Sequence, residues 1–294
     1  MSDSHGGLSD SHGGSSGSHG ASSDTRGASS GSHGVGSSTS WDPNQYRRYS
    51  DHRLRPALDL IERIPVTAPR TVYDLGCGTG NVTRVLARRW PEASVVGLDH
   101  SPEMLAEAAA GEPSAIRWVQ ADLRDWHPEG APDVLFSNAT LHWLPAHATL
   151  FPNLLASIAP GGVLAVQMPR SWQLDSHRLM RETLADLKLG SDELRRSLEK
   201  DPVDAPETYW SLLAARSKHL DIWETEYLQV LDGPDPVLEW VKGTGLRPVL
   251  QELIGAARDR FLNDYGARLR KAYPHASDGR TLYPFRRLFL IAQV

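Results

Sequence analysis

A run of alternating glycines behind an aspartate is the stretch of this chain whose residue types are best suited to binding chemistry. Residues 74–81 read DLGCGTGN, and they stand between a short β-prone run and a helical pattern. Glycines in a strand-to-helix turn let a ligand approach the backbone, and free N–H groups at a helix start hold polar ligand atoms. The turn therefore predicts a cofactor site of the nucleotide-binding kind. Its candidate cofactor-binding residues are Asp74, Gly76, Cys77, Gly78, Gly80 and Asn81.

The glycine spacing and the leading acid distinguish between possible cofactors. A dinucleotide fingerprint reads G-x-G-x-x-G, whereas the third glycine here is Gly80 and position 81 is Asn. The Asp74 carboxylate would repel a pyrophosphate, but it suits a cofactor that carries a sulfonium and an ammonium. This D-x-G-x-G-x-G pattern resembles the first motif of the class I methyltransferases. The resemblance implies S-adenosylmethionine as cofactor and S-adenosylhomocysteine as product.

Polar residues at the ends of the following predicted strands extend the site. Residues 94–99 end in Asp99, whose carboxylate can accept hydrogen bonds from both hydroxyls of a ribose. The methyltransferase resemblance implies that Asp122 contacts the adenine amino group. It also implies that the end of the fourth strand, at Asn138, faces the transferred methyl group. Candidate cofactor-binding residues beyond the turn are Tyr46, Asp99, His100, Asp122, Leu123 and Asn138.

Strand and helix patterns alternate through most of the chain. The predicted strands are 71–75, 94–99, 115–120, 133–138 and 162–168, with helices at 81–90, 102–110 and 147–158. Alternation of this kind implies an α/β fold with a parallel sheet and helices on both faces. Late strands at 223–231 and 287–294 would supply the antiparallel C-terminal edge strand of a class I methyltransferase (Rossmann-like) sheet. Helix-rich stretches at about 170–220 and 234–272 are expected to form a helical cap over the site and a second helical segment.

Residues 1–40 differ in composition from the rest of the chain. Ser-His-Gly recurs with a period of seven residues, and the segment holds very few apolar side chains. A Gly/Ser-rich segment with so little to bury predicts a disordered tail. Its histidines could chelate a metal loosely, but we interpret the segment as a flexible extension. The folded methyltransferase domain is then predicted to span residues 41–294.

Composition argues against several classes of protein. The net charge is −5 and the isoelectric point is about 6.2, so no basic surface for nucleic acid is indicated. No apolar run approaches the roughly 18 residues of a membrane span, and no secretory signal begins the chain. Cys77 is the only cysteine, and we interpret it as a small residue packed under the turn rather than as a nucleophile. These features favour a cytoplasmic protein with no metal, nucleic-acid or membrane partner.

Motifs spread over residues 41–294 resemble the trans-aconitate 2-methyltransferase family. They include RWP at 89–91, SNA at 137–139, LHWLP at 141–145, VQMP at 166–169 and WVKGTGLRP at 240–248. That family usually has Gln where this chain has His142, so one hydrogen-bonding side chain replaces another. The resemblance implies methyl-ester formation on one carboxylate of trans-aconitate, a small tricarboxylate. A carboxylate is already ionised at neutral pH, so the reaction needs no general base and can depend on positioning.

A tri-anionic substrate requires cationic groups, and the planar fork of arginine matches a carboxylate well. The candidate substrate-binding residues are Arg53, Arg55, His142, Arg247 and Arg287. Asn138, His142 and Trp143 are the candidate catalytic residues, because they end or follow the fourth strand, where substrate and methyl group should meet. Tyr46 could cover the carboxylate of the cofactor.

Three other functions remain open at this stage. The protein could be a carboxyl or other O-methyltransferase for a different small organic acid. It could bind S-adenosylmethionine without catalysis, although its cofactor turn is intact. A nicotinamide-dependent oxidoreductase is disfavoured by Asp74 and by Asn81 in place of the third dinucleotide glycine. The oligomeric state is not indicated by the sequence.

We expect deletion of residues 1–40 to leave turnover unchanged, because the predicted tail contributes nothing to the core or to the cofactor turn. Steady-state kinetics of the truncated and full-length proteins would test this. A large loss of kcat/KM in the truncated protein would contradict it.

Overall fold

A computed structural model describes residues 54–111 and 115–294 of the chain. The predictions made for residues 1–40, and for Tyr46 and Arg53, lie outside the described residues. The remaining candidate residues are all described.

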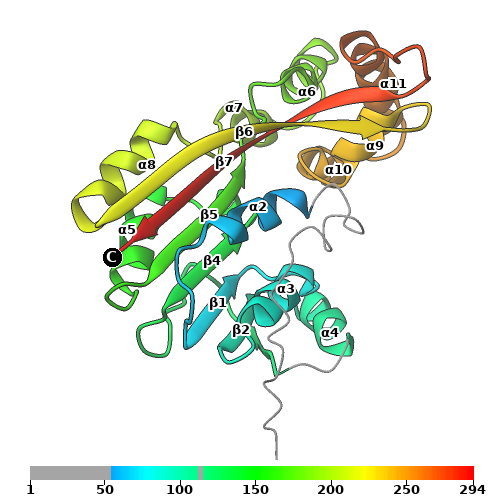
Figure 1. Cartoon of the computed structure of the whole chain (residues 1–294). Helices are drawn as coiled ribbons and strands as arrows, with labels where there is room; N and C mark the ends of the chain where they lie inside the picture. Colours follow the sequence, from blue (N-terminus) through cyan, green and yellow to red (C-terminus); the bar gives the residue numbers. More distant parts are fainter. Residues whose placement is uncertain (1–53, 112–114) are drawn as a thin grey trace, which may run out of the picture. The chain divides into compact units, whose positions relative to one another are not determined.

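Seven strands form one mixed sheet (Figure 1). They are β1 (Thr71–Leu75), β2 (Ser94–Asp99), β3 (Arg117–Gln120), β4 (Val134–Asn138), β5 (Val163–Pro169), β6 (His219–Leu231) and β7 (Thr281–Gln293). Their order is β3-β2-β1-β4-β5-β7-β6; β1 to β5 are parallel, and β7 is antiparallel to both β5 and β6. The predicted class I methyltransferase sheet with an antiparallel C-terminal strand is confirmed. The outermost position at that side belongs to β6, and β7 lies one place inside it.

The strand order places the cofactor turn where the direction of the connections reverses. β1 pairs with β2 on one side and with β4 on the other. In open α/β sheets such a switch point leaves a crevice at the carboxyl ends of the two central strands, and ligands bind there. The loops that follow β1 and β4 therefore hold the candidate site.

Helices cover both faces of the sheet (Figure 1). They are α2 (Arg55–Arg63), α3 (Asn81–Arg89), α4 (Pro102–Ala110), α5 (His147–Ala156), α6 (Asp175–Asp186), α7 (Asp192–Glu199), α8 (Pro206–Leu213), α9 (Pro236–Lys242), α10 (Arg247–Glu252) and α11 (Gly255–Ala272), with short 3-10 turns at Leu141–Trp143 and Ala214–Arg216. Buried side chains of α2, α3, α6, α7 and α9–α11 share one core with one face of the sheet. Those of α5 and α8 share a second core with the other face. None of the helices in residues 54–111 and 115–294 is both long and apolar enough to cross a membrane.

The segment predicted as a single cap, residues 170–220, divides between the two cores. α6 packs against α11 and α7, whereas α8 packs against α5 and β6. The division has a local cause, because Tyr209 and Leu213 of α8 are completely buried in the second core. Only α6 and α7 therefore join the later helices α9–α11.

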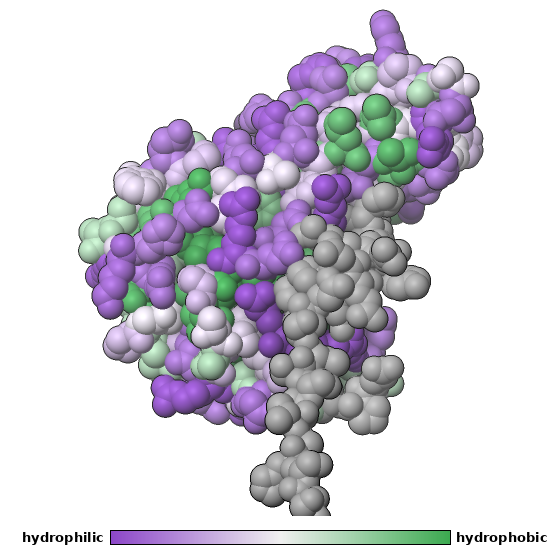
Figure 2. Space-filling model, viewed as in Figure 1, coloured by the Kyte–Doolittle hydropathy of each residue, from purple (hydrophilic) through white to green (hydrophobic). Residues whose placement is uncertain are grey.

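The last two strands are longer than their alternation predicts. β7 begins at Thr281 and contains Pro284, which lies beyond the last residue of β7 that pairs with β5. A strand with one open edge tolerates a residue that lacks an N–H group. On one face of this ribbon Leu228, Val230 and Leu282 are exposed, and Figure 2 shows an apolar patch there. The other face of the ribbon contributes to the core under α9 and α11.

Candidate active site

The glycine turn has the backbone that its sequence predicts. Gly76, Gly78 and Gly80 all have positive φ angles, between 53° and 77°, a region that favours glycine. A Cβ added at Gly76 would lie 2.1 Å from the Thr140 side chain, whereas one added at Gly78 would meet nothing within 4 Å. The N–H groups of Gly76 and Cys77 both donate to the Leu98 carbonyl, at 2.7 and 2.8 Å. The turn is thus fixed on β2 and packed against the loop after β4, with open space over its centre.

Asp74 lies beneath the turn and is only 2% exposed. Thr83 Oγ1 donates a hydrogen bond of 2.6 Å to its carboxylate. Burial raises the pKa of Asp74 to about 7, and the nearby charge of Asp99 acts in the same direction, while the bond from Thr83 opposes both. The same burial, with the charges of Asp74 and Asp99, raises the pKa of the Cys77 thiol. Cys77 is therefore a neutral packing residue, as its position in the turn predicts.

Asp99 ties the end of β2 to the glycine turn. Its carboxylate accepts hydrogen bonds from the backbone N–H of Gly78 at 2.9 Å and of Ser101 at 3.0 Å. His100 Nδ1 is 3.4 Å from the same carboxylate. Asp99 therefore stands beside the open centre of the turn, where a ribose could compete for its oxygens.

The candidate adenine region lies beyond the end of β3. The Asp122 carboxylate is half-exposed and is bound by the Arg124 guanidinium, which lowers the pKa of Asp122 to about 2. The side chain of Trp118, on β3, extends toward the turn. A Cβ added at Gly80 or at Gly97 would meet its ring at 2.4 or 2.5 Å. The indole thus fills the side of the turn that faces β3, a role that the sequence analysis did not predict. A glycine inside the second predicted strand was the available signal.

A strained loop follows β4 and carries the other candidate residues. Ala139 has a positive φ of 54°, which is uncommon for a residue other than glycine. Its N–H donates to the Gln167 carbonyl at 2.9 Å, and Thr140 Oγ1 donates to the Gly76 carbonyl at 3.1 Å. The loop is therefore anchored to β5 on one side and to the glycine turn on the other.

His147 anchors the 3-10 turn that contains His142. One ring nitrogen, Nε2, lies 2.9 Å from the Leu141 carbonyl, and the other, Nδ1, lies 2.8 Å from the Tyr209 hydroxyl. Because a carbonyl only accepts, Nε2 carries the proton and Tyr209 donates to Nδ1. This fixed chain of bonds positions His142 and Trp143.

His142 is neutral at physiological pH. Burial of the ring lowers its pKa to about 3, helped by the positive charge of Arg287. It therefore offers hydrogen bonds rather than charge. Trp143, its neighbour, is 58% exposed, and the two rings lie 4.6 Å apart.

Several buried polar atoms at the carboxyl ends of β4 and β5, in the segments that follow them, and on β7 beside the end of β5 have no hydrogen-bond partner among the described residues. They are Asn138 Oδ1, His142 Nδ1, Gln167 Nε2, Trp172 Nε1 and Arg287 Nε. Asn138 is paired in register with Gln167, and Arg287 is paired with Pro169, two residues further along β5. Buried polar atoms are almost always hydrogen-bonded. A group of unpartnered atoms at adjoining positions therefore indicates a polar ligand.

Arg287 places a positive charge in this region. The residue is 8% exposed, and its guanidinium lies 3.6 Å from the centre of the Phe285 ring. Burial lowers its pKa to about 9. Among residues 54–111 and 115–294, no carboxylate forms an ion pair with it. A buried charge is costly unless it is paired, so Arg287 is well suited to bind an anion.

The other candidate arginines are placed differently. Arg55, at the start of α2, is exposed and lies 5.0 Å from the centre of the Tyr227 ring. Arg247 is exposed at the start of α10. The structure thus brings Arg287 together with Asn138 and His142, and it leaves Arg55 and Arg247 outside this group.

Gln167, Trp172 and Thr83 were not among the predicted site residues. A signal for Gln167 was present, because it is the one polar residue in the apolar run 163–168. Trp172 lies in a loop beside His177, with ring centres 5.1 Å apart, and the available signal was an aromatic residue in the stretch expected to form the cap, which made it a weak candidate for a pocket wall. Thr83 lies in the first turn of α3, where a threonine gives no sign of a functional role.

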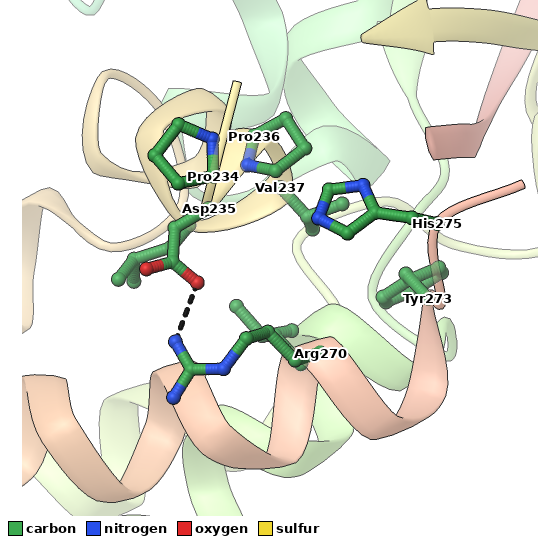
Figure 3. Close-up of a pocket in the computed structure, with 9 residues that line it drawn as sticks. Pro234, Asp235, Pro236, Val237, Arg270, Tyr273 and His275 are labelled. Atoms are coloured by element: carbon green, nitrogen blue, oxygen red, sulfur yellow. Dashed lines mark hydrogen bonds and ion pairs between the residues drawn. The ribbon is translucent and has the colours of Figure 1, made fainter. Parts of the chain in front are cut away.

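A separate, small and open pocket lies between α9 and the end of α11 (Figure 3). Its walls come from residues 234–238 and 269–275, and the ion pair of Asp235 with Arg270, at 2.6 Å, spans it. None of its lining residues belongs to the loops after β1 or β4. We therefore place the active site at the switch point and not here.

Comparisons with known proteins agree with this placement. A family model described as a methyltransferase domain matches residues 72–162. A trans-aconitate 2-methyltransferase of Azoarcus sp. (strain BH72) is 47% identical over 253 residues, which cover 86% of this chain and 98% of the relative. The chain belongs to the trans-aconitate 2-methyltransferase family. Another member of that family, from Streptomyces avermitilis, is 49% identical over 261 residues, covering 86% of this chain and 96% of its own.

Solved structures confirm the fold of this family member. The YcgJ protein of Bacillus subtilis matches with a TM-score of 0.54 at 13% identity, covering 81% of this chain and 98% of its own. Phosphoethanolamine N-methyltransferase 2 of Haemonchus contortus, in complex with S-adenosyl-L-methionine, matches with a TM-score of 0.50 at 16% identity, covering 81% of this chain and 52% of its own.

The groups around the turn fit S-adenosylmethionine, the cofactor of this methyltransferase family. Open space lies over Gly78, next to the carboxylate of Asp99. Asp74 and Asp99 are close enough for their negative charges to interact unfavourably. A ligand with a sulfonium and an ammonium relieves that repulsion, whereas a phosphate adds to it. Among the described residues there is no group of three or more potential metal ligands.

We expect Asp74→Asn to stabilise the ligand-free protein at pH 8 and to weaken cofactor binding. The folded protein holds the pKa of Asp74 at about 7, above its ordinary 3.8. Burying the ionised form therefore costs stability, and this loss grows as the pH rises through that window. Removing the charge should raise the free energy of unfolding by at most about 4 kcal/mol.

S-adenosylhomocysteine should bind this variant about ten-fold or more weakly, because the ammonium of the ligand no longer faces the carboxylate of Asp74. Thermal unfolding and calorimetry measure the two effects. A lower Tm at pH 8, or an unchanged Kd, would contradict the assignment.

We expect His142→Gln to retain most activity, because a neutral imidazole and an amide offer similar hydrogen bonds. By contrast, His142→Phe should lower kcat/KM about ten-fold or more. Because His142 stays neutral, the wild-type enzyme and His142→Gln should have the same pH profile near pH 6.5. A step there that is present only in the wild type would contradict this. Such a step would mean that the imidazole is charged during turnover.

Proposed function

We propose that the protein transfers the methyl group of S-adenosylmethionine to a carboxylate of trans-aconitate and releases a monomethyl ester. The observation that carries this proposal is the buried Arg287, which no carboxylate of the described residues neutralises. It lies among neutral hydrogen-bonding side chains, next to the loop that contacts the glycine turn. A small polycarboxylate fits such a site. The two relatives described above, which align over nearly their whole length, are named trans-aconitate 2-methyltransferase.

The chemistry needs little beyond positioning. The cofactor supplies an electrophilic methyl group when it is bound. An oxygen of the ionised carboxylate forms the new bond to that carbon, the carbon–sulfur bond breaks, and its electron pair stays on sulfur. Because a carboxylate has a pKa near 4, no side chain has to remove a proton. This agrees with His142, which burial keeps neutral. Most of the rate enhancement can come from holding the two reactants in line in a site that excludes water.

The geometry of the turn supports a proposal for the cofactor-binding roles. We propose that Asp74 balances the positive amino-acid end of the cofactor and that Asp99 accepts from the ribose hydroxyls. The glycines, Cys77 and Asn81 shape the turn, and Tyr46 is proposed to cover the cofactor carboxylate. His100, Asp122 and Leu123 are proposed to surround the adenine.

The domain boundaries, the cover over the substrate and the cellular location are also proposals. Residues 1–40 form a tail outside the methyltransferase domain of residues 41–294, and helices α6, α7 and α9–α11 cover the substrate. Arg53, Arg55 and Arg247 remain candidates for further carboxylate contacts. A cytoplasmic location is proposed on the single cysteine and the small-molecule substrate.

Incubation with isotope-labelled S-adenosylmethionine and trans-aconitate tests the function. We expect a labelled monomethyl ester with one predominant position of the ester. A panel of other polycarboxylates serves as the comparison. If trans-aconitate yields no ester while another acid does, the substrate assignment is wrong.

We expect Arg287→Met to raise the KM for trans-aconitate about 100-fold or more, because an ion pair with the substrate is lost. The same variant should have an equal or higher Tm, since an unpaired buried charge is removed. Arg286→Met is the matched control. Arg286 adjoins it on β7, but its half-exposed side chain pairs with Glu226 at 3.1 Å. Unchanged KM in Arg287→Met, or an equal rise in the control, would contradict the proposal.

A further inference from the structure

Gln167 interrupts an otherwise apolar strand at a position where a polar side chain has no structural partner. β5 presents Val163 and Ala165 to the same core, and Gln167 follows them at the carboxyl end of the strand. Gln167 is 1% exposed, and its Nε2 has no hydrogen-bond acceptor within residues 54–111 and 115–294. A methionine or leucine there would avoid the cost of an unmade hydrogen bond. The amide is therefore suited to a ligand that arrives from outside the chain.

The neighbours of Gln167 show where that ligand must lie. Asn138 is its register partner on β4, yet Asn138 Oδ1 and Gln167 Nε2 are both unpartnered. Two adjacent amides that could bind each other, and do not, leave their polar atoms available to a third group. Arg287, on β7 opposite Pro169, lies on the same face of the sheet as Gln167. The three side chains thus lie on successive strands along one edge of the sheet.

The order of these strands sets their distance from the cofactor turn. The loop after Asn138 touches Gly76 through Thr140, so β4 is nearest to the turn. β5 comes next, and β7 is one strand further out. Neighbouring strands are separated by roughly 5 Å. Gln167 is therefore closer than Arg287 to the place where the methyl group is transferred.

Charge also distinguishes the two positions. Methyl transfer removes the negative charge of the reacting carboxylate, so a cation bound to that carboxylate would stabilise the ground state more than the transition state. A neutral amide orients the carboxylate with a smaller penalty. A carboxylate that does not react keeps its charge throughout, so an arginine can hold it without slowing the reaction.

We propose that Gln167 Nε2 donates to the carboxylate that receives the methyl group, and that Arg287 binds a second carboxylate of the same substrate. The separation of the two side chains then determines which carboxylate is esterified. This inference rests on the proposed function, because it requires a substrate with at least two carboxylates.

Gln167→Met tests the inference, since methionine keeps the shape of the side chain and removes its polar atoms. We expect kcat with trans-aconitate to fall about ten-fold or more, the ester to form at more than one position, and KM to change much less than in Arg287→Met. Affinity for S-adenosylhomocysteine and the Tm should stay at or above the wild-type values. Gln229→Met is the matched control: Gln229 is also buried on this face of the sheet, but it is a residue that already forms an interaction within the protein. It should leave the ester position unchanged.

The possible outcomes separate the two proposals. If the wild-type protein makes no ester from trans-aconitate, the proposed function fails and this inference fails with it. If the wild type makes the ester and Gln167→Met keeps both its kcat and its single ester position, only the role of Gln167 is overturned. Should Gln167→Met fail to fold, Gln167→Leu also removes the polar atoms and places an apolar side chain of different shape there. A wild-type ester pattern and kcat in that variant would equally overturn the inference.

Discussion

Burial of the Arg287 guanidinium constrains the whole substrate side of this protein. A charge taken out of water is costly unless an opposite charge compensates it, and no carboxylate of the described residues pairs with this one. The surrounding side chains with unpartnered polar atoms are neutral; they are Asn138, His142, Gln167 and Trp172. In the ligand-free state the unpaired guanidinium therefore costs free energy. An anionic substrate that pairs with it can offset this cost. This explains how a site with so few ionised groups can prefer a polycarboxylate.

The cofactor side shows the opposite imbalance. Asp74 and Asp99 place two carboxylates around the glycine turn, and burial holds the pKa of Asp74 at about 7. In the proposed function, a positively charged methyl donor offsets this excess, and a polycarboxylate offsets Arg287. The two regions are joined by the loop after β4, which bonds to Gly76 through Thr140 and to Gln167 through Ala139. The sheet thus holds apart two regions of opposite charge, and we propose that the reaction takes place between them.

The cofactor half of the site was predictable because its determinants are local. Asp74, the glycines and Asp99 lie at strand ends whose order follows from the alternation of strands and helices. The substrate half depends on which strands become neighbours. Gln167 and Arg287 are 120 positions apart and meet only because β7 inserts between β5 and β6. The early start of β7 was hidden by Pro284, and the departure of α8 to the other face depends on the burial of Tyr209. Single residues in the sequence do not reveal such long-range pairings.

The most direct test of the central claim observes the Arg287 Nε–H group itself. In protein labelled with ¹⁵N-arginine and saturated with S-adenosylhomocysteine, Arg287→Lys identifies the resonance by its disappearance. Addition of trans-aconitate should shift this Nε–H proton downfield and slow its exchange with water, because a carboxylate now accepts its hydrogen bond. If the Arg287 resonance stays unchanged while trans-aconitate is bound, the buried arginine does not bind the substrate and the account is wrong.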